Sequence, residues 1–188
     1  MKRIVIFASG SGTNAENIIQ YFKIKKNVQI VMILANKKDA TVLDRANNHK
    51  ISALYFNKTA FYETKHILNL MLSVKPDLIV LAGFLWKFPA NIINMFVDKI
   101  INIHPALLPK YGGKGMYGMN IHNAIVENKE TETGITIHYV NENYDEGNII
   151  FQAKTNVLPS DSAEDIAKKV HELEYKHFPK IIEQLLYE

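Results

Sequence analysis

The stretch that decides the fold lies near the N-terminus and reads Ile4-Val5-Ile6-Phe7-Ala8-Ser9-Gly10-Ser11-Gly12-Thr13-Asn14-Ala15. It opens with a continuous apolar run, which indicates a strand buried on both faces. Two glycines interrupt the run, and apolar side chains then recur at helical spacing, at Ala15, Ile18, Ile19 and Phe22. A buried strand, a glycine turn and an amphipathic helix in this order are typical of a parallel α/β unit.

The same alternation continues to residue 104. Further buried strands are expected at residues 28–35, 53–56, 78–81 and 100–104. Helices are expected at residues 41–48, from an N-cap at Thr59 to about Val74, and from Pro89 to about Val97. Strands without polar alternation, separated by helices, predict a doubly wound, mostly parallel sheet with helices on both faces.

After residue 105 the pattern loosens into a glycine-rich loop at 111–118 and a helix at about 120–127. A pair of strands is expected at 134–140 and 148–153, around a polar loop. Pro159-Ser160-Asp161 is expected to open a long C-terminal helix that Pro179 kinks or divides. All 188 residues are therefore expected to form a single domain.

Composition narrows the classes of function. The 188 residues include no cysteine, which excludes disulfides, thiolate zinc sites and a thiol nucleophile. The net charge of +3 suits an anionic ligand, but with only two arginines we expect no nucleic-acid partner. No run approaches the roughly 18 apolar residues of a membrane helix, and the first apolar run is too short for a signal peptide. We expect a cytoplasmic protein without a membrane partner.

The glycine turn, Gly10 to Asn14, is the first candidate site. Glycines allow close backbone approach, and a helix N-terminus offers free N–H donors, so an anion such as a phosphate is expected here. A tight turn alone is the plain alternative. A dinucleotide site is another, because the turn formally matches G-x-G-x-x-A. A dinucleotide site also needs an acidic residue for the ribose at the end of the second strand. The chain there reads Ala35-Asn36-Lys37-Lys38, and the first carboxylate is Asp39.

The second candidate is Asn102-Ile103-His104. Residues two apart in a strand share a face, so Asn102 and His104 project together from the carboxyl end of a predicted parallel strand. An amide donor and an imidazole can serve a reacting carbonyl as an oxyanion donor and a proton shuttle. A lone histidine at a strand end is ordinarily a hydrogen-bonded surface group.

The third candidate is Asp145, in the polar loop between the last two strands. Such acids are usually solvated, but a carboxylate beside His104 would raise its pKa and keep the ring cationic. His138 is expected to be either a core residue or a supporting contact. Glu174 faces the body of the protein and is expected to form a salt bridge or touch a ligand. The other histidines lack metal-ligand spacing, so no metal is predicted.

These segments resemble the glycinamide ribonucleotide (GAR) transformylase family, within the folate-dependent formyltransferases, from Met1 to about Glu183. The specific matches are the glycine turn ending in Thr13-Asn14, the run Leu81-Ala82-Gly83-Phe84, and Asn102-Ile103-His104-Pro105-Ala106-Leu107-Leu108-Pro109-Lys110-Tyr111. The family resemblance implies transfer of a formyl group from 10-formyltetrahydrofolate, as co-substrate and without a metal, to the amine of GAR in purine biosynthesis.

The resemblance also implies roles for individual residues. Asn102, His104 and Asp145 match the catalytic group, while Gly12, Thr13 and Asn14 match the phosphate loop. Glu174 matches the carboxylate near the glycinamide amine. The residues that match the folate site are Lys58, Leu85, Trp86, Lys87 and Phe88, together with Asn102. Residues 1–104 would then be a mononucleotide-binding half and 105–188 a folate and catalytic-loop half, in a monomer or homodimer.

Two stretches depart from the family pattern. Where relatives commonly continue Met-Arg, this chain has Leu85-Trp86-Lys87 after Phe84. The loop Gly112–Gly118 is longer and richer in glycine than the usual turn, and is expected to be a lid or a tolerated insertion. Both departures leave the catalytic group intact.

Three other functions share parts of this pattern. A formyl-folate hydrolase would use the same three residues with water as nucleophile, usually with an additional N-terminal domain. A transfer-RNA formyltransferase would need an extra C-terminal domain. A non-catalytic mononucleotide-binding module would need only the glycine turn.

Overall fold

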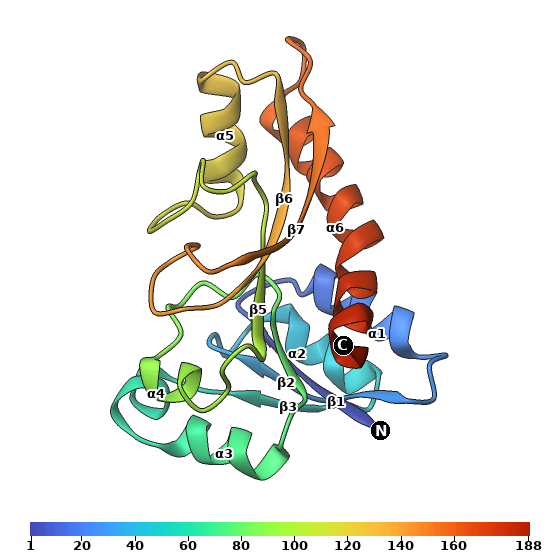
Figure 1. The fold of residues 1–188 in the computed structure, drawn as a ribbon, viewed down its shortest axis with the longest axis vertical. Coiled ribbons are helices and arrows are strands. Elements are labelled where there is room, and N and C mark those ends of the chain that lie inside the picture. Colours follow the sequence, from blue (N-terminus) through green and yellow to red (C-terminus); the bar gives the residue numbers. More distant parts are fainter.

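The computed structural model describes residues 1–188, which form one seven-stranded sheet with helices on both faces (Figure 1). The strand order is β3-β2-β1-β4-β5-β6-β7. The first five strands run parallel, and β6 and β7 are antiparallel to their neighbours. The predicted fold class is confirmed. The strands are β1 Lys2–Ala8, β2 Val28–Ala35, β3 Ser52–Tyr55, β4 Leu78–Leu81, β5 Ile100–His104, β6 Glu132–Tyr139 and β7 Ile149–Asn156.

The helices cover two separate cores. Helices α1, α2, α5 and α6 pack on one face of the sheet, and η1, α3 and α4 pack on the other. None of them combines the length and the apolar composition that a membrane crossing requires. The helices are α1 Thr13–Phe22, α2 Thr41–Asn48, the π-helical η1 Thr59–Glu63, α3 His66–Val74, α4 Ala90–Ile93, α5 Met119–Glu127 and α6 Ala163–Tyr187.

Strand β1 shows why its sequence is apolar without alternation. Ile4 and Ile6 belong to the core under α1 and α6, whereas Val5 and Phe7 belong to the core under α3 and α4. Successive side chains point to opposite faces of a strand, so a central strand covered on both faces needs apolar residues at every position. All four of these side chains are fully buried.

Two of the predicted helices on the sheet face that α3 covers have other bounds in the structure. The expected helix from Thr59 to Val74 is split, because Thr64 adopts an extended backbone (φ −115°, ψ 173°) between η1 and α3. Thr59 is not an N-cap; the side chain of Asn57 accepts from the Ala60 N–H instead. Helix α4 ends at Ile93 rather than Val97, and the chain then turns at Asp98 (φ 55°) before it enters β5.

Helix α6 starts later than predicted and is not divided. Its N-cap is Ser162, which forms a reciprocal capping box with Asp165, so Pro159–Asp161 lies before the helix. The helix then continues through Pro179 to Tyr187 as one element. Proline cannot donate to the carbonyl four residues earlier, and that carbonyl, on Tyr175, accepts from Asn17 Nδ2 at 3.0 Å. An outside donor thus replaces the missing helical hydrogen bond.

The loop between β6 and β7 folds back along β5. It leaves β6 at Val140, whose N–H donates to the carbonyl of Ile100 at the start of β5, and Gly147 passes so close to Tyr139 that an added Cβ would lie 1.7 Å from its carbonyl oxygen. Only glycine fits at such an approach. Within the loop, Asp145 lies beside His104 at the carboxyl end of β5.

Candidate active site

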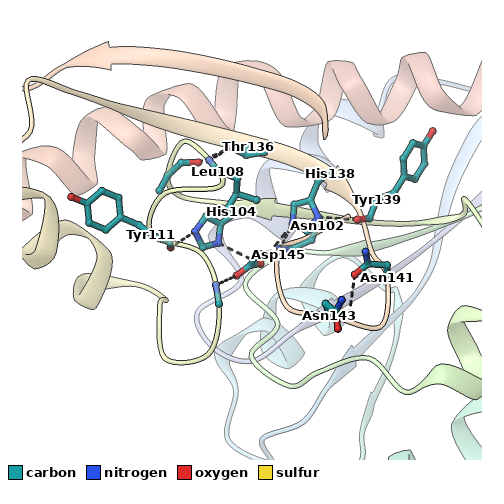
Figure 2. Close-up of polar contacts among 12 residues, drawn as sticks. Asn102, His104, Leu108, Tyr111, Thr136, His138, Tyr139, Asn141, Asn143 and Asp145 are labelled. Atoms are coloured by element: carbon teal, nitrogen blue, oxygen red, sulfur yellow. Dashed lines mark hydrogen bonds and ion pairs between the residues drawn. The ribbon is translucent and has the colours of Figure 1, made fainter. Parts of the chain in front are cut away.

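Asn102 and His104 project from the end of β5 toward the loop between β6 and β7 (Figure 2). The antiparallel register places His138 of β6 opposite Asn102, and Asn102 Nδ2 lies 3.1 Å from His138 Nε2. On its other side, the His138 ring donates from Nδ1 to the Tyr139 carbonyl at 2.8 Å. This leaves Nε2 of a neutral His138 as the acceptor for the Asn102 amide.

Asp145 lies between the two histidines. Its Oδ1 is 3.6 Å from His104 Nδ1 and 3.7 Å from His138 Nε2, and its side chain is 12% exposed. Its Oδ2 accepts from the Gly113 N–H at 2.9 Å. The structure therefore brings together the amide, the imidazole and the carboxylate that the sequence places far apart.

His104 does not have the raised pKa that the sequence pattern suggested. The ring is only 3% exposed, and burial lowers its pKa from the ordinary 6.5. Asp145 and the Tyr111 carbonyl raise the pKa, but not enough to offset burial. At 3.6 Å the carboxylate is too far for a hydrogen bond with the ring, so it offsets the effect of burial only in part. The expectation that Asp145 raises the pKa of His104 above its ordinary value is wrong for this structure.

A cleft opens beside Asn102, His138 and Asp145, which belong to its lining. The other lining residues are Leu81, Phe84, Trp86, Lys87, Phe88, Val140, Asn141, Asn143 and Tyr144. Two residues predicted to contact folate lie outside this lining. Leu85 is 39% exposed, and its N–H donates to Ser9 Oγ. Lys58 instead places Nζ 5.9 Å from the centre of the Trp86 ring.

The glycine turn has the geometry of an anion site. Gly12 has φ 71°, and a Cβ there would lie 2.4 Å from Val42 Cγ2, so only glycine fits. Helix α1 follows at Thr13 without a side-chain cap, which leaves the N–H groups of its first turn free. Arg45 holds the turn by donating from Nε to the Ser11 carbonyl at 2.8 Å. Free donors at a helix N-terminus favour a phosphate here.

Glu174 of α6 lies at the start of α1. Its side chain is 5% exposed, and Oε2 accepts from Asn14 Nδ2 at 2.9 Å and from His171 Nδ1 at 2.8 Å. This hydrogen bond raises the pKa of His171. Nearby, burial lowers the pKa of His122, and its Nδ1 has no hydrogen-bond partner. Through Asn14 the carboxylate lies beside the glycine turn.

Sequence reasoning missed three contacts of the site. His138 could have been placed opposite Asn102 by aligning β5 and β6 as an antiparallel pair. The spacing of His171 and Glu174 on one helix face was also a usable signal, since residues three apart are neighbours. The Tyr111 carbonyl has no such signal, because every residue carries a backbone carbonyl. No group of three His, Asp or Glu side chains is arranged to hold a metal ion.

Fold and site together define an α/β protein with a glycine turn at the N-terminus of α1 and with an amide, an imidazole and a carboxylate at the carboxyl edge of its sheet. The family model of formyl transferases matches residues 2–182. The chain belongs to the formyl transferase family.

Curated relatives and solved structures agree with this assignment. A phosphoribosylglycinamide formyltransferase of Haemophilus influenzae is 36% identical over 97% of this chain and 86% of its own length. The chloroplastic enzyme of that name from Arabidopsis thaliana is 34% identical over 96% of this chain, which spans only 64% of that relative. The crystal structure of the phosphoribosylglycinamide formyltransferase from Anaplasma phagocytophilum superposes with a TM-score of 0.89, at 30% identity, covering 98% of this chain and 86% of the other.

Proposed function

We propose that this protein transfers the formyl group of 10-formyltetrahydrofolate to the amine of glycinamide ribonucleotide, a step of purine biosynthesis. The observation that carries the proposal is that Asn102 and Asp145 line the cleft, and that His104, 3.6 Å from Asp145, also feels the charge of Glu174 beside the glycine turn. Two substrates bound at those places would meet over these side chains. The similarity to phosphoribosylglycinamide formyltransferases supports the same activity.

In the proposed reaction the substrate amine attacks the formyl carbon directly, and no covalent enzyme intermediate forms. A C–N bond forms to the amine, and the C–N bond to the folate nitrogen then breaks. Asn102 Nδ2 donates one hydrogen to His138, and its second hydrogen is free for the oxygen that becomes negative. One such donor contributes on the order of 10²–10³ in rate.

His104 would move the proton from the attacking amine to the departing folate nitrogen. Its Nε2 donates to the Tyr111 carbonyl, so Nδ1 of the neutral ring is the atom that accepts the proton. Asp145 Oδ1, on the same side, would stabilise the imidazolium that results. General acid–base help of this kind is worth roughly 10²–10⁴ in rate.

The proposal assigns the remaining residues to the two substrates. Gly12, Thr13 and Asn14 would hold the GAR phosphate, and Glu174 would lie near the glycinamide amine. The formyl-folate would occupy the cleft, with contacts from Asn102 and from Lys58, Leu85, Trp86, Lys87 and Phe88. In this arrangement residues 1–104 form the mononucleotide-binding half of the domain, and residues 105–188 form the folate and catalytic-loop half. A cytoplasmic location and a monomeric or homodimeric state stay predictions.

One assay tests the proposed function. The protein is mixed with 10-formyltetrahydrofolate with and without GAR, and loss of the formyl group is followed by absorbance. Loss only in the presence of GAR supports transfer. Loss without GAR would instead indicate a hydrolase that uses the same three residues, and no loss in either mixture would indicate a binding module.

A further inference from the structure

The three-residue segment Tyr111–Gly113 contacts both members of the imidazole–carboxylate pair through its backbone. The Tyr111 carbonyl accepts from His104 Nε2 at 2.8 Å, and the Gly113 N–H donates to Asp145 Oδ2 at 2.9 Å (Figure 2). Each bond is made by the atom that does not take part in the contact between His104 and Asp145. The ring uses Nε2 rather than Nδ1, and the carboxylate uses Oδ2 rather than Oδ1. The position of one short segment therefore controls the tautomer of the ring and the orientation of the carboxylate.

The backbone of this segment is held in turn by the Tyr111 side chain. The phenol hydroxyl donates to Glu130 Oε1 at 2.9 Å and accepts from Asn128 Nδ2 at 3.0 Å. Both partners directly follow α5, and Glu130 is also paired with Lys110 at the surface. Tyr111 itself has φ 57°, a conformation that a bulky residue adopts only where its surroundings hold it.

The segment also packs tightly against Asp145. A Cβ on Gly112 would lie 2.7 Å from Leu108 Cδ2 and 3.3 Å from the Asp145 Cβ. A side chain at residue 112 would press on Leu108 and on Asp145, so the segment and the carboxylate are closely packed. A shift of the segment that Tyr111 anchors would therefore move Asp145 as well.

We propose that Tyr111 is a positioning residue for the reaction: its hydroxyl, held by Glu130 and Asn128, fixes the carbonyl that orients His104 and the N–H that orients Asp145. This inference rests on the proposed function and assigns a role to the start of the Gly112–Gly118 loop. Tyr111 acts through other groups and does not touch the reacting atoms.

The charge state of His104 gives the inference a measurable signature. Asp145 and the more distant Glu174 face the ring as carboxylates, and His138 is the other titratable ring beside it. The Tyr111 carbonyl favours the protonated ring. If the carbonyl moves away, the pKa of His104 falls and the acid limb of the kcat profile shifts to lower pH.

The test compares two pairs of variants. Tyr111→Phe keeps the ring but removes the hydroxyl, and we expect kcat to fall about tenfold with KM for both substrates within about twofold. Tyr117→Phe is the matched control, because this tyrosine of the same loop is half exposed and its hydroxyl makes no side-chain hydrogen bond. Glu130→Ala should reproduce Tyr111→Phe, whereas Glu130→Gln retains an oxygen that accepts from the phenol and should keep wild-type kcat.

A second measurement does not need turnover. The His104 ring nitrogens are followed by NMR during a pH titration, and the pKa should be lower in Tyr111→Phe than in the wild type and Tyr117→Phe. If Tyr111→Phe loses only thermal stability, with kcat, pH profile and His104 pKa as in the wild type, the inference is wrong. If the wild type shows no GAR-dependent transfer, the proposed function fails, and the titration still decides whether Tyr111 holds the ring.

Discussion

Asn14 and Glu174, which are 160 positions apart in the chain, are joined by a 2.9 Å hydrogen bond from Nδ2 to Oε2. The bond ties the first turn of α1 to the middle of α6, and His171 donates to the same oxygen. A carboxylate buried this deeply needs such donors, because an unpaired buried charge is costly. Asn14 directly follows the glycine turn, so the contact that packs α6 against α1 also fixes the side chains beside that turn.

The first prediction concerns this carboxylate. Glu174→Ala should raise KM for GAR by about 10- to 100-fold, because it removes a charged substrate contact and frees Asn14 from its fixed position. KM for the folate should change little. Steady-state kinetics with each substrate varied in turn measures both values. Glu172→Ala, at an exposed position of the same helix, is the control; equal KM values for GAR in both variants would contradict the role of Glu174.

A second prediction concerns His104. His104→Ala should lower kcat by roughly 10²–10⁴, since the proton of the attacking amine loses its acceptor. The fold should persist, as judged by circular dichroism and a cooperative thermal transition. His66→Ala removes an exposed histidine as a control. Near-normal turnover of a folded His104→Ala protein would remove His104 from the mechanism.

The glycine turn allows a test of stability with a control two residues away. At Gly12 an added methyl would overlap Val42 at a backbone conformation that disfavours side chains, so Gly12→Ala should cost about 1–3 kcal/mol of unfolding free energy. A Cβ at Gly10 meets nothing within 4 Å, and Gly10→Ala should be close to neutral. Urea denaturation measures both. Equal losses in the two variants would show that the Val42 contact is unimportant.

Stability should also fall as the solution becomes acidic. Burial lowers the pKa of His104, His122 and His138 in the folded protein below the ordinary 6.5. As the pH falls through 6.5, the unfolded chain takes up protons that the folded protein does not, so the folded state loses stability. Each such histidine contributes up to about 1.4 kcal/mol per pH unit in that window. His171, whose pKa is raised, opposes this trend.

Urea denaturation at pH 7.5 and 5.5 checks this prediction. The wild type should be less stable at pH 5.5, and His122→Gln should reduce the difference, because it removes one of the buried rings. His66→Gln, at the surface, should leave the difference unchanged. Equal wild-type stability at both pH values would mean that the buried histidines do not remain neutral.

Local signals predicted the central sheet well and the covering helices less well. Strands β2, β4 and β5 have the predicted bounds because a strand buried on both faces must be apolar throughout. The helix expected from Thr59 to Val74 is broken because Phe61 turns into an aromatic cluster with Phe7 and Phe84, a tertiary contact that the local pattern does not contain. Helix α6 begins at Ala163 and not at Pro159, because the capping box of Ser162 and Asp165 sets its start.

By itself the sequence determined the class of fold, the glycine turn at the N-terminus of the first helix and the shared face of Asn102 and His104, because each follows from the local geometry of a strand, a turn or a helix end. Only the tertiary structure decided that Asp145 reaches His104, that Glu174 meets Asn14, and that a backbone carbonyl of Tyr111 fixes the ring. It also decided the direction in which the pKa of His104 is shifted, since desolvation depends on every segment that covers the ring and outweighs the neighbouring carboxylate.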